Sequence, residues 1–326
     1  MKIFDRDTTR SALPFDRLIP ALKQAFIEGC HVPLRHVHHL NDDDPSATRV
    51  LIMPAWQDDG LMGIKTVHIS PRNRDLGKPG LHSTYLLYSS KTGEPLAMIN
   101  GDEITSRRTA AASALGGSFL ARPDASRLFV AGTGRVGSLL PDAYAAVRDL
   151  SEVTIWDIDE GAATTLVQQL NERGFKASVA KDLETAVQQA DIISCATLAT
   201  APFIKGEWLQ PGSHLDLIGS FTPDMREADD DAFANARLFI DTEEALMKSG
   251  ELLEPMSRQV FAARDVVATL TELCTGATKG RETPEERTVF KAVGTALEDL
   301  AAAALVYQTE DPATGDQAGQ ELLAKS

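Results

Sequence analysis

Residues 127–157 read RLFVAGTGRVGSLLPDAYAAVRDLSEVTIWD, and this stretch decides the fold class. An apolar run at 128–131 leads into the glycine pattern Gly132-Thr-Gly134-Arg-Val-Gly137. An amphipathic segment follows, and a second β-rich run then ends at Asp157. The glycines alone are weak evidence, but a strand before them, a helix after them and an acid beyond a second strand together indicate a dinucleotide-binding unit.

Each part of this pattern has a physical role. Gly132 permits the tight turn out of the strand, Gly134 lets the backbone approach a pyrophosphate, and Gly137 allows the helix to pack closely on the sheet. The N-terminus of the helix favours phosphate oxygens, and Asp157 is placed to accept hydrogen bonds from an adenosine ribose. We therefore expect a nicotinamide or flavin dinucleotide; the alternative is a glycine-rich turn that binds nothing.

Strand and helix patterns alternate beyond residue 127, which predicts a Rossmann-type sheet. The strands are expected at 127–131, 152–157, 176–179, 191–195, 213–218 and 237–241. The helices are expected at 135–149, 159–173, 182–189 and 225–236, with a long final helix at 284–307. Before this region, a strand at 2–4 and a helix from near Pro14 precede several β-like runs between 31 and 97, and an alanine-rich helix follows at 105–120. The fold class is therefore α/β, a Rossmann domain with a smaller α+β domain.

Composition limits the classes of partner. The chain has 326 residues and a formal net charge of −15, which argues against binding to nucleic acid or to an anionic membrane. Neither a signal peptide nor a run of transmembrane length is present, so we expect a cytoplasmic protein. The three cysteines are widely spaced and form neither a disulfide framework nor a metal-binding pattern.

Three cations lie inside otherwise apolar stretches of the N-terminal half: Arg35, Lys65 and Arg108. Each alone is typical of a surface cation whose stem is buried. Together they can converge on a carboxylate, where charge-assisted hydrogen bonds are strong. The histidines at 36, 38 and 39 do not share one face of a strand, and no neighbouring ligand completes a set, so no metal site is expected. No nucleophile or carboxylate pair stands out, and the chemistry is expected to come from a cofactor.

Several blocks together make the sequence similar to one family. It resembles the ornithine cyclodeaminase/μ-crystallin family in the blocks LIMPAW, GIKTV, TGEPLAMINGDEIT, RRTAAASALGGSFLARPDA, GTGRVG, TLATAPFIKGEWLQPGSHLDLIGS and VFKAVGTALEDLAAAALVY. The resemblance implies a homodimer. It also implies a substrate-binding and dimerisation domain formed by residues 1–118 with 295–326, and a Rossmann domain at 119–294.

The resemblance also implies roles for individual residues. Lys65 and Arg108 match the catalytic cations of the family. The expected substrate-binding residues are Arg35, Lys65, Thr84, Arg108 and Phe221. The expected cofactor-binding residues are Gly132, Thr133, Gly134, Arg135, Val136, Gly137, Asp157, Thr197, Val293 and Gly294. Among these, Thr197 and the pair Val293–Gly294 match segments on the two sides of the nicotinamide.

One departure from the family's pattern concerns the reaction. Ornithine cyclodeaminases carry an aspartate just after the glycine of a strand-end motif that reads Leu217-Ile218-Gly219 here, whereas this chain has Phe221 at that position. A phenyl ring cannot exchange a proton, so cyclodeamination is not expected. The version GSFTPDMREAD resembles members that reduce the cyclic ketimines Δ1-pyrroline-2-carboxylate and Δ1-piperideine-2-carboxylate to proline and pipecolate.

Other activities stay open. An alanine-dehydrogenase-like or opine-type amino-acid dehydrogenase, residual cyclodeaminase activity, and a non-catalytic nucleotide-dependent binding protein of the crystallin type are the alternatives. For the cofactor we expect NAD(H) in preference to NADP(H), because Asp157, Asp159 and Glu160 would repel a 2′-phosphate. Arg135 or a distant residue reaching that phosphate is the alternative.

Overall fold

The computed structural model describes residues 1–41, 44 and 47–310, and it forms two compact units. The first unit comprises Met1–Arg108 with Thr295–Ser326, and the second comprises Thr109–Gly294. The boundary falls inside α3 (Gly101–Leu120), and the boundary expected at 118/119 falls inside the same helix. The expected domain roles stay predictions, and residues 311–326 of the first domain lie outside the described part of the chain.

The first unit is built on a six-stranded mixed sheet, as the β-like runs predicted. Its strand order is β1-β6-β5-β4-β3-β2, with β1 parallel to β6 and the other pairs antiparallel. The strands are β1 (Lys2–Phe4), β2 (His36–His39), β3 (Arg49–Trp56), β4 (Leu61–Ile69), β5 (Leu81–Ser89) and β6 (Pro95–Asn100), with a 3₁₀ turn η1 (Pro71–Leu76) after β4.

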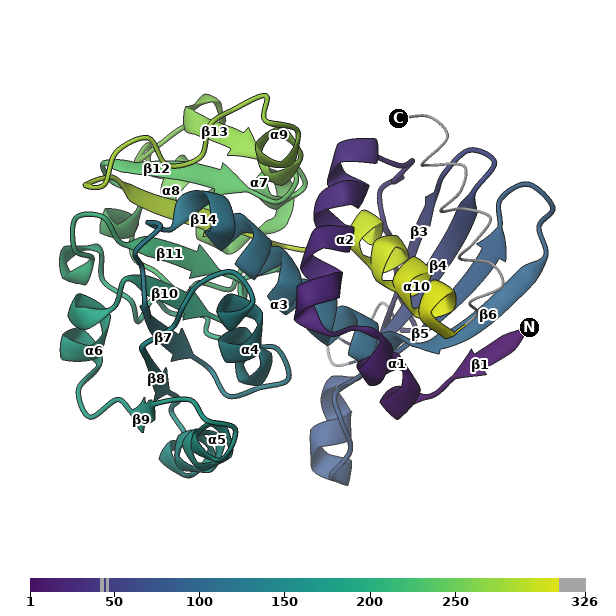
Figure 1. The fold of residues 1–326 in the computed structure, drawn as a ribbon, viewed down its shortest axis with the longest axis horizontal. Helices are drawn as coiled ribbons and strands as arrows, with labels where there is room; N and C mark the ends of the chain where they lie inside the picture. The colour runs from purple at the N-terminus through teal and green to yellow at the C-terminus, as the bar shows by residue number, and fades with distance from the viewer. Residues whose placement is uncertain (42–43, 45–46, 311–326) are drawn as a thin grey trace. The chain divides into compact units, whose positions relative to one another are not determined.

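Helices cover one face of this sheet. They are α1 (Arg6–Ala12), α2 (Phe15–Glu28) and α10 (Ala296–Glu310). The apolar residues of α2 recur at helical spacing and are buried, and α10 packs against α2, β3 and β4 (Figure 1). Along β4 the alternating residues Gly63, Lys65 and Val67 are buried, whereas Ile64 and Thr66 on the other face are only half-buried. Lys65 therefore lies on the face that the helices cover.

The second unit has an eight-stranded sheet in which every pair is parallel. The order is β13-β12-β14-β11-β10-β7-β8-β9. The strands are β7 (Arg127–Ala131), β8 (Glu152–Trp156), β9 (Ala177–Val179), β10 (Ile192–Cys195), β11 (His214–Leu217), β12 (Ala236–Ile240), β13 (Val266–Thr269) and β14 (Arg287–Lys291). This confirms the predicted Rossmann-type fold. The strand order reverses between β7 and β10, and ligands of such sheets bind at the carboxyl ends of the strands beside this reversal.

The helices of the second unit are shorter than the sequence pattern predicted. They are α4 (Leu140–Ala145), α5 (Glu160–Glu172), α6 (Leu183–Gln189), α7 (Ala245–Lys248), α8 (Gly250–Ser257) and α9 (Leu270–Thr275). The 3₁₀ turns are η2 (Gly137–Leu139), η3 (Gly206–Trp208), η4 (Asp230–Ala232) and η5 (Ala263–Asp265). The helix expected at 135–149 is thus reduced to η2 and α4. Pro141 lies in the first turn of α4, where its missing N–H is tolerated and its fixed φ suits the start of a helix.

Two further predictions were wrong. The segment expected as a helix at 225–236 is a loop with η4, because its backbone N–H groups are used in other bonds. Those of Glu227 and Ala228 donate to the carboxylate of Glu251, and those of Arg226 and Asp229 donate to carbonyl oxygens of the 199–204 segment. The helix expected to start at Pro284 begins at Ala296 instead. Residues Arg287–Lys291 form β14, which is buried between β11 and β12, and this parallel pairing overrides the helix-start signal of Pro284 and the following acids.

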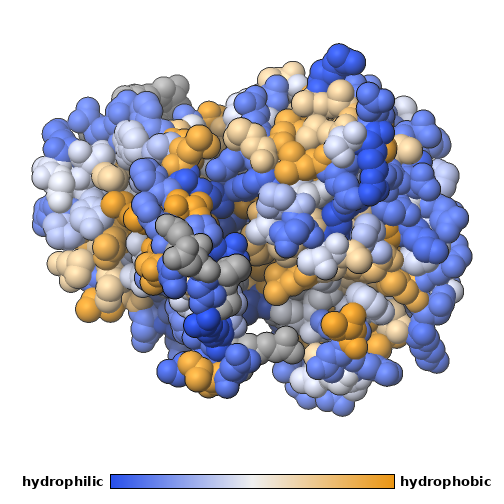
Figure 2. All heavy atoms as spheres, turned by 180° about the vertical axis from the view of Figure 1, so that it is seen from behind, coloured by the Kyte–Doolittle hydropathy of each residue, from blue (hydrophilic) through white to orange (hydrophobic). Residues whose placement is uncertain are grey.

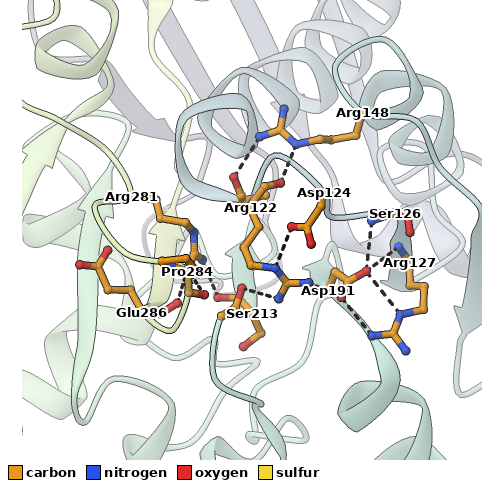
Figure 3. Close-up of polar contacts among 12 residues, drawn as sticks. Arg122, Asp124, Ser126, Arg127, Arg148, Asp191, Ser213, Arg281, Pro284 and Glu286 are labelled. Carbon is orange, nitrogen blue, oxygen red and sulfur yellow. Dashed lines mark hydrogen bonds and ion pairs between the residues drawn. The ribbon is translucent and has the colours of Figure 1, made fainter.

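An arginine network ties together the amino ends of the strands in the second unit (Figure 3). Asp191, just before β10, accepts hydrogen bonds from Arg122 and from the side chain and backbone N–H of Arg127. Burial opposes ionisation of Asp191, but these donors lower its pKa to about 2. Arg281 donates to the backbone oxygens of Leu120 and Ser213. Asp191 and the arginines of this network are therefore paired with groups of the same unit.

Candidate functional site

The glycine loop after β7 has two glycines fixed by packing and one that faces open space. Gly132 has φ +100°, and a Cβ there would lie 2.7 Å from the carbonyl oxygen of Ala196. A Cβ on Gly137 would lie 2.0 Å from the carbonyl oxygen of Gly132. A Cβ on Gly134 would meet no atom within 4 Å. The backbone at Gly134 thus has open space beside it, which the approach of a pyrophosphate requires.

Asp157 closes the loop from the neighbouring strand β8. Its Oδ2 accepts hydrogen bonds from the backbone N–H (2.8 Å) and the hydroxyl (2.7 Å) of Thr133, and its Oδ1 accepts from the N–H of Asp159. Burial opposes ionisation, but these donors lower the pKa of Asp157. The residue that caps α5 is Asp159, whose side chain accepts from Ala162. Asp157 is therefore an ionised acid that orients the loop and keeps lone pairs for further donors.

The loops after β10 and β14 are held by buried acids that the sequence analysis did not single out. The carboxylate of Glu227 accepts from the N–H (2.7 Å) and the hydroxyl (2.8 Å) of Thr197. The carboxylate of Asp241 accepts from the N–H groups of Val293 (2.7 Å) and Gly294 (2.6 Å). Arg135 and Val136 lie in the glycine loop, exposed and half-buried respectively. All ten residues expected at the dinucleotide thus follow carboxyl ends of β7, β8, β10 or β14.

In the first unit, two of the predicted cations converge on one carboxylate of α10. Lys65 Nζ donates to Asp299 Oδ1 at 2.8 Å, and Arg108 Nε donates to the same oxygen at 2.9 Å. Arg108 Nη1 also donates to Glu298 Oε2 at 2.6 Å. All four side chains are buried, with Lys65 only 1% and Arg108 5% exposed.

Burial and charge set the protonation of this cluster. Burial lowers the pKa of Lys65 to about 8; Asp299 opposes this shift, and the positive charges of Arg108 and Arg35 add to it. Burial opposes the charge on Arg108, but Asp299 and Glu298 raise its pKa further above its usual range. Lys65 and Arg108 balance Asp299 and Glu298 in formal charge, and Arg35 adds one positive charge near them. The cluster therefore suits one small anion.

Two other expected substrate residues are not brought to this cluster within a single unit. Thr84 pairs with Thr66 and Asn100, so it faces the side of the sheet opposite to Lys65 and is exposed. Phe221 belongs to the second unit, where it follows β11 and is 39% exposed. Their assignment to the substrate stays a prediction.

The comparisons with known proteins cover nearly the whole chain. The model of the ornithine cyclodeaminase/mu-crystallin family matches residues 9–312. The protein belongs to this family. Δ(1)-pyrroline-2-carboxylate reductase of Colwellia psychrerythraea is 36% identical over 317 residues, which is 94% of this chain and 99% of that protein.

Solved structures of the family agree with the fold. The Thermococcus litoralis Δ(1)-pyrroline-2-carboxylate reductase in complex with NADH and L-proline is 30% identical, covers 97% of this chain and 98% of its own, and has a TM-score of 0.90. An archaeal alanine dehydrogenase dimer with bound NAD is also 30% identical, covers 94% and 95%, and has a TM-score of 0.87. These matches confirm the predicted family and fold class, and they agree with the prediction of an imine oxidoreductase.

Sequence reasoning about this family member missed the acids that hold the site. Glu298 and Asp299 lie in the first turn of an otherwise apolar helix, EDLAAAALV, and are 0% exposed. Charged residues are seldom fully buried unless they are paired, so two adjacent acids at the start of an otherwise apolar helical run were a usable signal for buried cationic partners. Glu227 and Asp241 offered no such periodic signal, because each lies in an irregular segment.

Proposed function

We propose that the protein reduces cyclic ketimine carboxylates, Δ1-pyrroline-2-carboxylate and Δ1-piperideine-2-carboxylate, to L-proline and L-pipecolate with NADH. The observation that carries this proposal is the buried convergence of Lys65 and Arg108 beside Arg35 in a chain that also has an open glycine loop. The first feature suits the substrate carboxylate and the second suits a dinucleotide. The reductase of Thermococcus litoralis, solved with NADH and L-proline, supports the same assignment.

The residues of this chain would contribute mainly position and charge. When bound, the reduced nicotinamide supplies a hydride to an electrophilic carbon. Arg108 presents a fixed guanidinium fork and Lys65 a point charge, so together they hold the carboxylate and orient the ring attached to it. Asp299 and Glu298 hold both cations in place before the substrate arrives. Protonation of the imine nitrogen makes the adjacent carbon more electrophilic, and no acid stands at Phe221 to direct deamination instead.

The preference for NADH rests on the charges beside Asp157. The acids Asp157, Asp159 and Glu160 follow β8 within four residues, and the pKa of Asp157 is lowered, so its carboxylate is ionised at neutral pH. A 2′-phosphate on the adenosine ribose would lie against these carboxylates, and like charges repel. A ribose with two free hydroxyls can instead donate hydrogen bonds to Asp157.

The homodimer is proposed from the open face of the first sheet. Pro54, Ile64, Leu86 and Met98 form a row across four strands on the face opposite to α10, and all four are only half-buried. Because α2 and α10 lie in front of this sheet in Figure 1, Figure 2 shows its other face, where hydrophobic and hydrophilic residues alternate. A row of incompletely buried apolar side chains on a sheet face favours contact with a second protein surface. Light scattering at micromolar concentration should give twice the mass of the chain, and a stable monomer would contradict the proposal.

A panel of substrates tests the reaction. Oxidation of NADH is measured with each of the two cyclic imines and with pyruvate plus ammonia. Release of ammonia is measured with L-ornithine. We expect turnover of the imines to exceed the other reactions by orders of magnitude. The archaeal alanine dehydrogenase at 30% identity makes pyruvate with ammonia the second candidate. Faster reaction with pyruvate, comparable release of ammonia from ornithine, or binding of NADH without any turnover would each replace the proposal by one of its alternatives.

Among the described residues, none of the helices combines the length and apolarity needed to cross a bilayer. The cytoplasmic location stays a prediction.

A further inference from the structure

Buried acids hold three loops at the carboxyl edge of the second sheet. Glu227 has both carboxylate oxygens occupied: Oε1 accepts from the N–H and hydroxyl of Thr197, and Oε2 accepts from the N–H of Gly219 at 2.8 Å. One side chain thus joins the loop after β10 to the loop after β11. The two loops touch, because a Cβ on Gly219 would lie 2.0 Å from the carbonyl oxygen of Thr197.

A second layer of acids fixes the first. Glu251 of α8 accepts hydrogen bonds from the backbone N–H groups of Glu227 (2.7 Å) and Ala228 (2.9 Å), so it anchors the segment that carries Glu227. Asp241 holds the loop after β14 through Val293 and Gly294. Thr197, Gly219 and Val293 are far apart in the sequence, yet they follow the neighbouring strands β10, β11 and β14.

One buried cation attracts the three acids Glu227, Glu251 and Asp241. Lys291, the last residue of β14, is 0% exposed, and its ammonium donates to the carbonyl oxygen of Leu217 at 3.0 Å. Burial raises the pKa of Glu227 and lowers that of Lys291, whereas the attraction between them opposes both shifts. Four buried acids, these three and Asp216, attract this single cation. Such a cluster is an expensive way to stabilise a core, because buried charges lose their hydration. Such a cluster is better explained by a need for exact loop positions.

The order of strands indicates which part of a dinucleotide these loops face. Asp157 follows β8 and the glycine loop follows β7, so an adenosine ribose and a pyrophosphate bound there occupy the β8–β7 side. The strands on the other side of β7 are, in order, β10, β11 and β14. Glu227 and Asp241 hold the loops after these three strands. The remaining, nicotinamide half of the cofactor therefore extends over the loops that Glu227 joins.

We propose that Glu227 is a positioning residue that sets the Thr197 and Gly219 loops for the nicotinamide half of the cofactor. This inference rests on the proposed function, since it requires the dinucleotide to bind at the glycine loop. Glu227 acts through the two loops and does not touch the cofactor. Its loss should weaken binding of the nicotinamide half and leave binding of the adenosine half unchanged.

The substitution Glu227→Gln tests this with little change in shape. A glutamine has one acceptor oxygen and an NH₂ group, so it keeps its hydrogen bond to either Thr197 or Gly219 and turns a donor toward the other N–H. Dissociation constants are measured by calorimetry for NADH and for ADP-ribose, which lacks the nicotinamide. Glu254→Gln is the matched control, because Glu254 lies on α8 beside Glu251 but pairs with Arg226 and Arg258.

We expect Glu227→Gln to weaken NADH binding at least about tenfold, a ratio that corresponds to ~1.4 kcal/mol, with ADP-ribose affinity unchanged. Equal loss for both ligands, or no loss for either, would overturn the inference. Wild-type protein that binds neither ligand would instead refute the proposed function. If Glu227→Gln does not fold, Thr197→Val removes the hydroxyl that donates to Glu227 and accepts from the N–H of Ala199, and it keeps the backbone bond to Glu227. The same selective loss for NADH is expected, and unchanged NADH affinity then overturns the inference.

Discussion

Lys65 and Asp299 lie 234 residues apart in the sequence and form a buried ion pair, with Lys65 Nζ 2.8 Å from Asp299 Oδ1. Arg108 shares this carboxylate oxygen at 2.9 Å. The pair explains how a lysine with an exposed fraction of 1% can carry a charge at neutral pH. Because breaking a buried pair leaves an uncompensated charge, Asp299 is as important to the cation cluster as the cations themselves.

Binding of a ring carboxylate should weaken at alkaline pH. Burial lowers the pKa of Lys65 to about 8, so the ammonium that attracts the carboxylate is lost as the pH rises through that value. We expect the affinity for pyrrole-2-carboxylate, whose ring nitrogen carries no ionisable imine, to be flat below pH 8 and to fall by up to roughly tenfold per pH unit above it. Calorimetry from pH 6 to pH 10 measures this. A flat profile over the whole range would exclude Lys65 as a carboxylate ligand.

Substitution of Arg108 should weaken binding of the substrate and leave binding of the cofactor unchanged. Arg108→Lys keeps one positive charge but loses the fork that contacts Glu298 and Asp299. We expect kcat/KM for the imine to fall by a factor equivalent to about 2–5 kcal/mol, mainly through KM, with an unchanged dissociation constant for NADH. Arg107→Lys, at the preceding position of α3, is the control, because Arg107 donates to the carbonyl oxygen of Leu13. A similar loss in both variants would contradict the assignment.

Ionisation of the buried carboxyl of Asp216 should lower the free energy of unfolding at neutral pH. It is fully buried in β11, and burial raises its pKa to about 6 although Ser194 and Tyr144 donate hydrogen bonds to it. Since its folded pKa lies above the ordinary value of 3.8, the folded state loses stability as the pH rises between the two values and stays lower above them. Asp216→Asn keeps an acceptor and removes this penalty. Relative to wild type, the variant should gain about 2 kcal/mol between pH 4.5 and pH 7.5.

Urea denaturation at the two pH values measures that gain, and taking the difference between variant and wild type cancels the other titrating groups. Asp142→Asn is a suitable control, since Asp142 pairs with Arg173 at the surface. A variant whose stability relative to wild type does not change with pH would show that Asp216 is ionised at little cost.

We predict that the acids after β8 decide the choice of cofactor. We expect kcat/KM for NADH to exceed that for NADPH about tenfold or more, since ~1.4 kcal/mol suffices for that ratio. Asp157→Ser should narrow the difference, because it removes one of the three charges and keeps a hydroxyl for hydrogen bonding. A clear preference of the wild type for NADPH would show that Arg135 or a more distant cation reaches the phosphate.

Local sequence signals predicted six of the eight strands of the second unit and missed β13 and β14. The runs before Gly132 and before Asp157 are short, apolar and bounded by turn residues, and they became β7 and β8 within one residue of the expected bounds. Prediction failed at β14, where Pro284 and two acids suggested the start of a helix. Helical and strand patterns are hard to separate in a short apolar run, and only pairing with β11 and β12 selects the strand.

The sequence by itself determined the dinucleotide loop, because a turn needing φ +100° at Gly132 and no side chain at Gly137 is specified within six residues. It also marked Lys65 and Arg108 as cations out of place in apolar runs. Only the tertiary structure decided which groups pair with these cations, because their partner Asp299 lies on α10, far from both in the sequence. It also placed Glu227 and Asp241 beneath the loops of distant strands. Such contacts depend on long-range packing, and no local pattern encodes them, because the residues share neither a period nor a neighbourhood along the chain.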